Sequence, residues 1–479
     1  MKKQSITVNY ILNTAYQVLT LITPLITAPY ISRVLGADGV GVYSYTSAVV
    51  AFFALFAILG TTVYGQRTIA QCRDDKAARS KNFWEIELLS LLSTAVCLAA
   101  WFIFILISPE YKFIFFILTI ELLSKGFDIS WFYAGLERFS FIVIRNTVIK
   151  LVGILLLFLL VKRSDQVWIY IAILSVSNFL GNVSMWLPLR KLVSKIKLRD
   201  VQMKEHFRQT MIYFVPTIAA SVYTYLDKVM IGWFTEGTSE NGYYEQANRI
   251  IKIGYTVLIS LNTVMSSRMS YLFALNKEKE IKNKLENALA FIITLGLPVV
   301  CGISCIASNF VPWFFGEGFD KVVLLMILSS PLVVILSMHN FLSSQYLVPS
   351  GQRARSTKGV FIGAGVNFCF NLLLVPFLQS VGAVIATLIA ETSICVVYFY
   401  MSKDFVSPKL ILKYLPKQLL AAEAMSAVVL VIGWGRSGSI LITVVQIIAG
   451  GAVYFGALLL FREKFTLGFF KKTLYRFKK

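Results

Sequence analysis

The sequence predicts an all-α integral membrane protein with about fourteen transmembrane helices. Of its 479 residues, 57% are hydrophobic and only 15% are charged, and the mean hydropathy is +0.70. A soluble domain is about a quarter charged, and its helices are apolar along one stripe only. Here the apolar residues form long runs, such as 113–120 and 151–161, which are typical of helices that lie in lipid.

The apolar runs divide into fourteen predicted spans of about 20 residues each. The first is too long and too polar for a cleaved signal peptide, so we interpret it as a spanning helix. The longest polar connection, 190–208, leaves no room for a soluble domain between spans. The predicted spans are 9–32, 42–65, 84–107, 113–134, 141–161, 167–188, 210–234, 243–268, 288–314, 322–346, 359–378, 381–401, 416–434 and 440–461.

The basic residues predict how the chain is oriented in the bilayer. Most of the 46 Lys and Arg residues fall in connections on the side of the N-terminus, and about six fall in connections on the other side. Because cytoplasmic connections are enriched in Lys and Arg, both termini are expected in the cytoplasm. The net charge of +21 therefore reflects topology and does not indicate nucleic-acid binding.

A short internal repeat suggests two related halves. Tyr30–Val34 and Gly41 in the first half are matched by Tyr225–Val229 and Gly242 in the second. We expect two pseudo-symmetric six-helix lobes that move by alternating access around a site between them, followed by two further helices. The expected parts are an N-terminal lobe at 1–200, a C-terminal lobe at 201–402, and the last two helices with a basic cytoplasmic tail at 403–479.

Ionisable residues inside the spans are the first candidates for function. A charge buried at mid-bilayer costs at least about 2.5–3.5 kcal/mol, so such residues usually face a cavity or a partner. Glu121, Lys125 and Asp128 share one face of a helix. They either line a hydrated cavity or neutralise one another between helices.

Further bases suggest a positively charged chamber that attracts an anion such as a phosphate. Lys150 lies too deep for an easy reach to the interface, and Lys252 lacks the local acidic partner that Glu245 offers to Arg249. The cationic candidates are Lys125, Arg145, Lys150, Arg249 and Lys252, together with Arg33 and Arg268 near helix ends, where interface anchoring is the competing interpretation. The acidic and polar candidates of the same cavity are Glu121, Asp128 and Asn146.

A second group of residues carries oxygen ligands. Carboxylate, amide and hydroxyl oxygens either coordinate a coupling cation or form hydrogen bonds between helices. These residues are Asp227, Asn367, Asn371, Thr387 and Glu391. The six cysteines lack zinc-ligand spacing and the chain has only two histidines, so we expect no metal site and no cofactor beyond a sodium or proton gradient.

Four motifs, in the same order, resemble those of Wzx-type polysaccharide and oligosaccharide flippases, and the resemblance covers about the first 400 residues. They are Pro29–Tyr43; Asp227–Gly232 with Gly242–Arg249; Gln345–Gly351; and Asn367–Asn371 with Gly382–Thr387. This family belongs to the MOP superfamily, with MATE-type antiporters and lipid II flippases. The resemblance implies a V-shaped two-lobed bundle in a bacterial cytoplasmic membrane.

The resemblance also implies a function and a set of partners. The implied function is translocation of undecaprenyl-diphosphate-linked repeat units for capsule, exopolysaccharide or O-antigen synthesis, in contact with polysaccharide polymerase machinery. Lipid II flippases of this superfamily are associated with a sodium site on the seventh, eleventh and twelfth helices, at places similar to Asp227, Asn367, Asn371 and Thr387. A second acidic ligand is expected where Asn371 stands, so this site is either weaker, proton-driven or absent.

Three other functions compete with this prediction. A lipid II flippase shares nearly all of the same physics. A MATE-type drug or cation antiporter calls for an acidic or aromatic chamber, whereas the bases here favour an anion. A membrane glycosyltransferase or repeat-unit polymerase calls for a long outer loop, and the longest predicted one is only 235–241. The sequence shows no catalytic triad or phosphate-binding loop, so we do not expect an enzyme.

Overall fold

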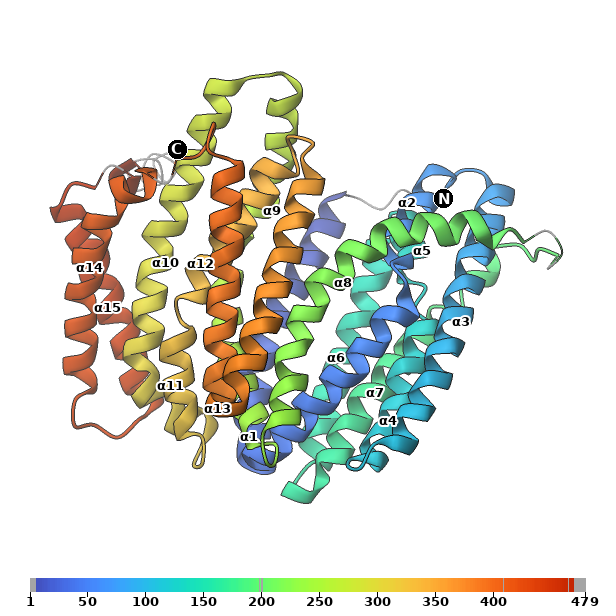
Figure 1. Cartoon of the computed structure of the whole chain (residues 1–479), viewed down its shortest axis with the longest axis horizontal. Coiled ribbons are helices and arrows are strands. Elements are labelled where there is room, and N and C mark those ends of the chain that lie inside the picture. The colour runs from blue at the N-terminus through green and yellow to red at the C-terminus, as the bar shows by residue number, and fades with distance from the viewer. Residues whose placement is uncertain (1–5, 198, 200, 408, 464, 469–479) are drawn as a thin grey trace. The chain divides into compact units, whose positions relative to one another are not determined.

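The structure is a computed structural model that describes residues 6–468, apart from 198, 200, 408 and 464. Every regular element in these residues is a helix (Figure 1). The chain forms two compact units, which divide between Gly242 and Tyr243. We call them unit 1 and unit 2 and describe each by itself. The lobes inferred from the repeat, 1–200 and 201–402, remain a prediction.

Unit 1 contains the first eight α-helices and the start of the ninth. Two 3₁₀ turns, Ser164–Gln166 and Leu189–Lys191, flank α7. The helices are α1 (Ile6–Ile58), α2 (Thr61–Gln71), α3 (Lys76–Ile107), α4 (Lys112–Gly126), α5 (Ser130–Gly135), α6 (Phe139–Leu160), α7 (Val167–Ser184) and α8 (Met203–Phe234).

Unit 2 contains most of the ninth helix and all later ones. A π-helical turn, Leu342–Leu347, follows α12. The helices are α9 (Ser239–Ala274), α10 (Glu278–Phe315), α11 (Asp320–Ser329), α12 (Leu332–Phe341), α13 (Arg353–Met401), α14 (Lys409–Gly433) and α15 (Ile440–Leu460).

Each of the fourteen predicted spans is mainly helical, although turns interrupt 42–65, 113–134 and 322–346, and the all-α membrane fold class is confirmed. Nine helices in the described residues are long and apolar enough to cross a bilayer. Two pairs of predicted spans are continuous rather than separated by loops. The first pair forms α1, which bends at Gly36 (φ 68°, ψ −178°), and the pair 359–378 and 381–401 forms α13, which bends at Gln379 (φ 54°, ψ −130°).

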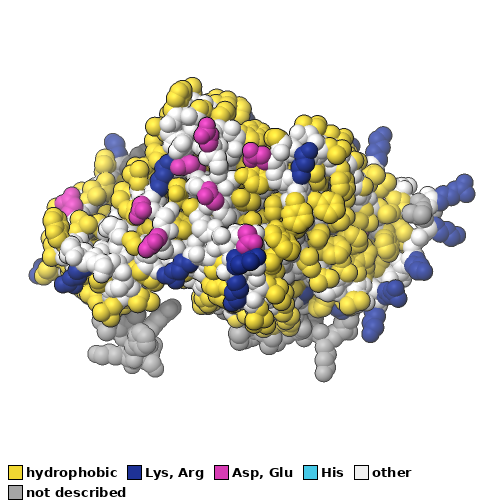
Figure 2. Space-filling view, turned by 90° about the horizontal axis from the view of Figure 1, so that it is seen from below, with side chains coloured by type: hydrophobic (Ala, Val, Ile, Leu, Met, Phe, Trp, Pro, Cys, Tyr) yellow, Lys and Arg dark blue, Asp and Glu magenta, His cyan; other side chains and the backbone are white. Residues whose placement is uncertain are grey.

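The surface carries many large apolar side chains that no other residue covers. Leu106 and Ile107 are 75% and 76% exposed at the end of α3, and Phe377 in α13 is 84% exposed. Apolar side chains cover much of the face in Figure 2. Soluble monomers rarely expose contiguous apolar areas of this kind, so these side chains are expected to contact lipid tails.

In unit 1, α3 packs along the broken helix pair α4 and α5. The ring of Phe83 in α3 stacks on Trp131 in α5, with ring centroids 5.6 Å apart. Two to three turns further along α3, Thr94 lies so close to Gly126 that a Cβ atom there would be 3.0 Å from the threonine Oγ1. The stretch of α3 between these contacts therefore faces the break between α4 and α5.

Two glycines let backbone segments cross closely at one end of unit 1. A Cβ atom on Gly41 would lie 1.7 Å from the carbonyl oxygen of Thr238, and one on Gly242 would lie 2.1 Å from that of Ala37. Gly41 and Gly242 are the glycines matched in the sequence repeat. Each contacts the residue four positions before the other, so the crossing is reciprocal, as a local two-fold arrangement requires.

Helices α9 and α10 are longer than a bilayer is thick. They have 36 and 38 residues, which corresponds to about 54 Å and 57 Å of helix at 1.5 Å per residue. The hydrocarbon core is about 30 Å thick. Their joined ends, around Asn276, rise beyond the other helices of unit 2 (Figure 1).

Candidate functional site

Two of the predicted cavity residues neutralise each other within α4. The Lys125 Nζ lies 2.6 Å from Glu121 Oε1, and both side chains are largely buried. Asn178 in α7 donates from Nδ2 to the other glutamate oxygen at 3.0 Å. This arrangement matches the self-neutralising alternative that the sequence left open. Lys125 therefore contributes less uncompensated positive charge than the sequence suggested.

Asp128 lies at the break between α4 and α5, where it has a local structural role. Its Oδ1 accepts a hydrogen bond of 2.9 Å from the Ser130 amide, the first residue of α5. A carboxylate at this position satisfies an amide that the helix itself leaves unpaired. The same carboxyl group is an electrostatic neighbour of Arg145 on α6.

The bases of α6 have no salt bridge in the described part of the chain. The Arg145 Nη2 contacts the sulfur of Met185 at 2.7 Å, and Arg145 Nε is buried without a hydrogen-bond partner among the described residues. Lys150 donates from Nζ to Thr20 Oγ1 at 3.1 Å and lies 5.3 Å from the centre of the Tyr16 ring. Both side chains are partly buried, as is that of Asn146 next to Arg145. Lys150 is thus held by neutral groups of α1, whereas Arg145 contacts Met185, which follows α7, and has Asp128 as an electrostatic neighbour.

The bases of unit 2 are arranged differently. On α9, the Arg249 Nε is 3.1 Å from Glu245 Oε1, which is the pairing that the sequence suggested, whereas Lys252 is exposed. Arg268 is exposed, pairs with Glu280 at 3.2 Å and stacks on the Tyr271 ring, which suits an interface anchor. Arg33, in unit 1, is also exposed.

The candidate ion-coupling residues do not all belong to one unit. Asp227 is buried on α8 in unit 1, whereas the other four lie on α13 in unit 2. Asn371 donates to Asn367 Oδ1 at 3.0 Å, and both side chains are fully buried.

Glu391 has a histidine as its neighbour, which sequence reasoning did not anticipate. Glu391 is fully buried, and its Oε2 lies 2.6 Å from Nδ1 of His339 on α12. Thr387, one turn earlier on α13, is half-buried. A role for Glu391 in ion binding must therefore involve His339 as well.

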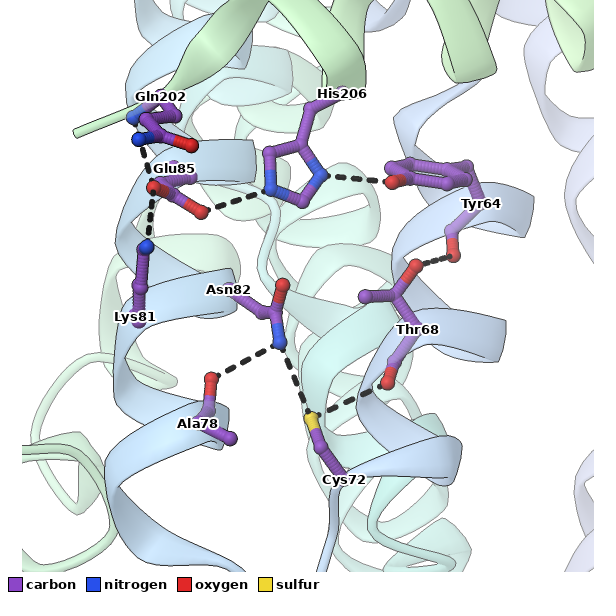
Figure 3. A network of polar contacts seen from close by, with 9 residues as sticks. All are labelled: Tyr64, Thr68, Cys72, Ala78, Lys81, Asn82, Glu85, Gln202 and His206. Carbon is purple, nitrogen blue, oxygen red and sulfur yellow. Dashed lines mark hydrogen bonds and ion pairs between the residues drawn. The ribbon is translucent and has the colours of Figure 1, made fainter.

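A polar network in unit 1 was also missed by sequence reasoning (Figure 3). His206 of α8 bridges Glu85 of α3, at 2.9 Å from Nε2, and the Tyr64 hydroxyl of α2, at 2.7 Å from Nδ1. Glu85 also accepts a hydrogen bond of 2.8 Å from the Gln202 amide. The network joins three helices through one buried imidazole. The signal available in the sequence was an acidic residue at the edge of the predicted span 84–107.

Comparison with known proteins places this arrangement in a family. A family model described as "Polysaccharide biosynthesis protein" matches residues 6–273. The chain belongs to this family. Its members include the kind of membrane transport protein that the motifs predicted, and the expectation that the chain is not an enzyme is confirmed.

Individual members and solved structures agree with this membership. A protein of Shigella dysenteriae named "Putative O-antigen transporter" is 24% identical over 375 residues, which cover 78% of this chain and 93% of that protein. A solved structure of the lipid II flippase MurJ in an inward closed conformation has a TM-score of 0.76 at 17% identity, covering 95% of this chain and 99% of that one. An inward-facing MATE family multidrug resistance transporter of the MOP superfamily has a TM-score of 0.55 at 15% identity, covering 80% and 97%.

The similarity to these two solved structures establishes the fold of this protein. It is a multi-pass helical membrane protein with the fold shared by MurJ and MATE transporters.

Proposed function

We propose that the protein is a flippase for undecaprenyl-diphosphate-linked oligosaccharide repeat units. It would move them from the inner to the outer leaflet of a bacterial cytoplasmic membrane by alternating access, for capsule, exopolysaccharide or O-antigen synthesis. Family membership and the O-antigen transporter name of the Shigella relative support this substrate class. Both termini would lie in the cytoplasm, and polymerase machinery would receive the translocated units.

One observation carries the proposal: unit 1 holds bases inside its membrane helices without salt bridges in the described residues. Lys150 and Arg145 contact a hydroxyl, a ring and a thioether. Asp128 is an electrostatic neighbour of Arg145, whereas Lys150 has no acidic partner in the described residues and is therefore available to an anion. A diphosphate offers the oxygens that Arg and Lys recognise, and a low-dielectric environment strengthens that attraction.

The same proposal assigns roles to Lys252 and to the candidate ion-coupling residues of both units. Lys252, exposed and without a salt bridge in the described part of the chain, would meet the anionic headgroup when the substrate enters. Asp227, Asn367, Asn371, Thr387 and Glu391 would couple transport to a sodium or proton gradient. A role in ion coupling fits the burial of all of these except the half-buried Thr387, because buried polar side chains in a membrane protein are retained where they bind something or hold helices together.

A lipid II flippase is the second candidate, favoured by the TM-score of 0.76 to MurJ. Its substrate carries the same lipid diphosphate but a different sugar. The cationic groups named above would bind the diphosphate of either substrate. The two candidate functions therefore differ in the sugar that is transported and not in how the diphosphate is bound. Substrate competition separates them.

The test is a transport assay in liposomes with a fluorescent undecaprenyl-diphosphate oligosaccharide. Lys150→Ala should reduce translocation at least tenfold, because the headgroup loses a cationic partner. Lys162→Ala is a matched control, because Lys162 also lies over a tyrosine of α1, 5.8 Å from the Tyr30 ring, but follows the end of α6. The control should transport as the wild type does.

The outcomes separate the candidates. Normal transport by Lys150→Ala would remove Lys150 from the site. Competition by unlabelled lipid II at equal concentration would favour the second candidate. A wild-type protein that moves organic cations but no lipid would replace both flippase functions with an antiporter.

A further inference from the structure

A fully buried carboxyl group in α3 has no hydrogen-bond partner among the described residues. Glu87 has no exposed surface, and neither Oε1 nor Oε2 is hydrogen-bonded within that part of the chain. Burying an ionised carboxylate without donors is among the most costly arrangements in a protein, whereas the neutral acid loses far less. The packing around Glu87 therefore fits the protonated form.

The neighbours of Glu87 are defined by the contacts on either side of it. One turn before it, Phe83 stacks on Trp131 of α5, and two turns after it, Thr94 meets Gly126 of α4. Glu87 thus faces the α4–α5 break, where Asp128 is its electrostatic neighbour. The Thr94 hydroxyl on the same side of α3 is also buried, with no hydrogen-bond partner in the part of the chain that the structure describes. The break is therefore lined by polar groups of α3 whose hydrogen-bonding capacity is unused.

Titratable groups of α2, α4 and α8, which pack against α3, are already engaged. His206 of α8 contacts Glu85 and the Tyr64 hydroxyl of α2. Lys125 of α4 is paired with Glu121. Asp128 is the remaining acidic group near Glu87. It is only partly buried, accepts a hydrogen bond from the Ser130 amide and has Arg145 as an electrostatic neighbour. Glu87 is fully buried and has no donor in the described residues, so its surroundings favour the neutral acid.

Glu85, two residues away in the same helix, is a buried carboxyl group that does have hydrogen-bonding partners. Residues two apart on an α-helix point in nearly opposite directions. Glu85 contacts the imidazole of His206 on α8 and accepts a hydrogen bond from the backbone amide of Gln202 (Figure 3). Glu87 faces the α4–α5 break and has no hydrogen-bond donor among the described residues. The contrast arises from the position of each residue on the helix and not from the type of side chain.

We propose that Glu87 is a proton-binding site of unit 1, occupied by a proton in the conformation described here. The proton comes from water and adds to one carboxylate oxygen, and its release to water leaves the carboxylate. This inference deepens the proposed function by naming a residue and an ion for gradient coupling in unit 1. Its first test does not depend on that function.

The first test is infrared difference spectroscopy of the purified protein in lipid nanodiscs at neutral pH. The carbonyl stretch of a protonated carboxyl group should be present in the wild type and absent in Glu87→Gln. Glu85→Gln is the matched control and should keep the band. Glu87→Leu removes the same carbonyl group, so it replaces Glu87→Gln if the amide variant does not fold.

The outcomes of this test are distinct. A wild-type spectrum without the band at neutral pH, or a band unchanged in both Glu87 variants, would overturn the proposal. Loss of the band on adding sodium at constant pH would show that sodium competes with a proton bound at this carboxyl group, and would overturn the proton as its sole coupling ion. A band that disappears only as the pH rises supports the proposal.

The second test measures the rate of lipid translocation in liposomes, with and without a pH gradient across the membrane. Wild-type translocation of the fluorescent lipid-linked oligosaccharide should change several-fold with the gradient, whereas Glu87→Gln should show the same rate with and without it. A wild-type gradient response in Glu87→Gln would overturn coupling through this residue. A wild type that moves no lipid at all would overturn the proposed function, and the infrared result would still decide whether Glu87 holds a proton.

Discussion

At the scale of single residues, the two histidines of the chain each lie beside a buried glutamate. His206 contacts Glu85 at 2.9 Å in unit 1, and His339 lies 2.6 Å from Glu391 in unit 2. The two glutamates are 2% and 0% exposed. A carboxylate in such a place requires a donor, and an imidazole can supply one without a permanent charge.

Replacing His206 with alanine should therefore destabilise unit 1. Glu85 would lose its side-chain partner while remaining buried, which costs about 1–3 kcal/mol. The change is measured as a lower midpoint of thermal unfolding in detergent. Lys81→Ala is the control, because the exposed Lys81 is 3.9 Å from Glu85 and an exposed partner contributes little. Equal midpoints for His206→Ala and the wild type would contradict the structural role.

The sequence identifies some of these residues and misses others for a physical reason. Lys150 stands out because a base in the middle of an apolar run is visible in one dimension. Glu85 and Glu87 lie at the edge of a predicted span, where a charge is unremarkable. Whether each has a partner depends on how α3 is rotated against α2, α4 and α8. The hydropathy of the sequence does not predict how α3 is rotated about its axis.

At the scale of helices, the sequence predicts where apolar segments lie but not how they join. The predicted connection 33–41 is helical, because α1 continues through a bend at Gly36. The predicted span 113–134 is interrupted, because α4 ends at Gly126 and α5 begins at Ser130. A run of apolar residues fits a continuous helix and a broken one equally well, so hydropathy does not separate them.

The glycine crossing in unit 1 provides a test at this scale. Gly41→Ala should lower the free energy of unfolding by about 1–3 kcal/mol or more, because its Cβ would overlap the Thr238 carbonyl oxygen. Gly365→Ala is the control. No atom lies within 4 Å of a Cβ built there, so it should be neutral or stabilise α13 by up to about 1 kcal/mol. Thermal unfolding of both variants in detergent is the measurement, and equal midpoints would contradict the close approach.

At the scale of the whole molecule, the family and the fold agree with the hydropathy of the sequence. The orientation in the membrane remains a prediction from the basic residues, and it leads to opposite expectations for two connections. Glu236, exposed between α8 and α9, should face the outside, and Lys195, exposed after the turn Leu189–Lys191, should face the cytoplasm.

Cysteine labelling measures this orientation. In a variant without the six native cysteines, Glu236→Cys should react with a membrane-impermeant maleimide in intact cells. Lys195→Cys should react only after the membrane is permeabilised. The reverse pattern would show that the topology is inverted. Labelling of both cysteines in intact cells would contradict their location on opposite sides of the membrane. Denatured protein, in which both cysteines react, controls for reagent quality.

The long helices α9 and α10 have a practical consequence for imaging. A membrane protein of 53.8 kDa presents little outside its detergent micelle for particle alignment in electron microscopy. The hairpin around Asn276 projects beyond the other helices of unit 2, and both of its helices are continuous with the membrane-spanning part. A soluble helical protein fused in frame to both helix ends would be held rigidly as a fiducial marker. Images of such a fusion, with and without a lipid-linked oligosaccharide, would record the conformations that transport requires.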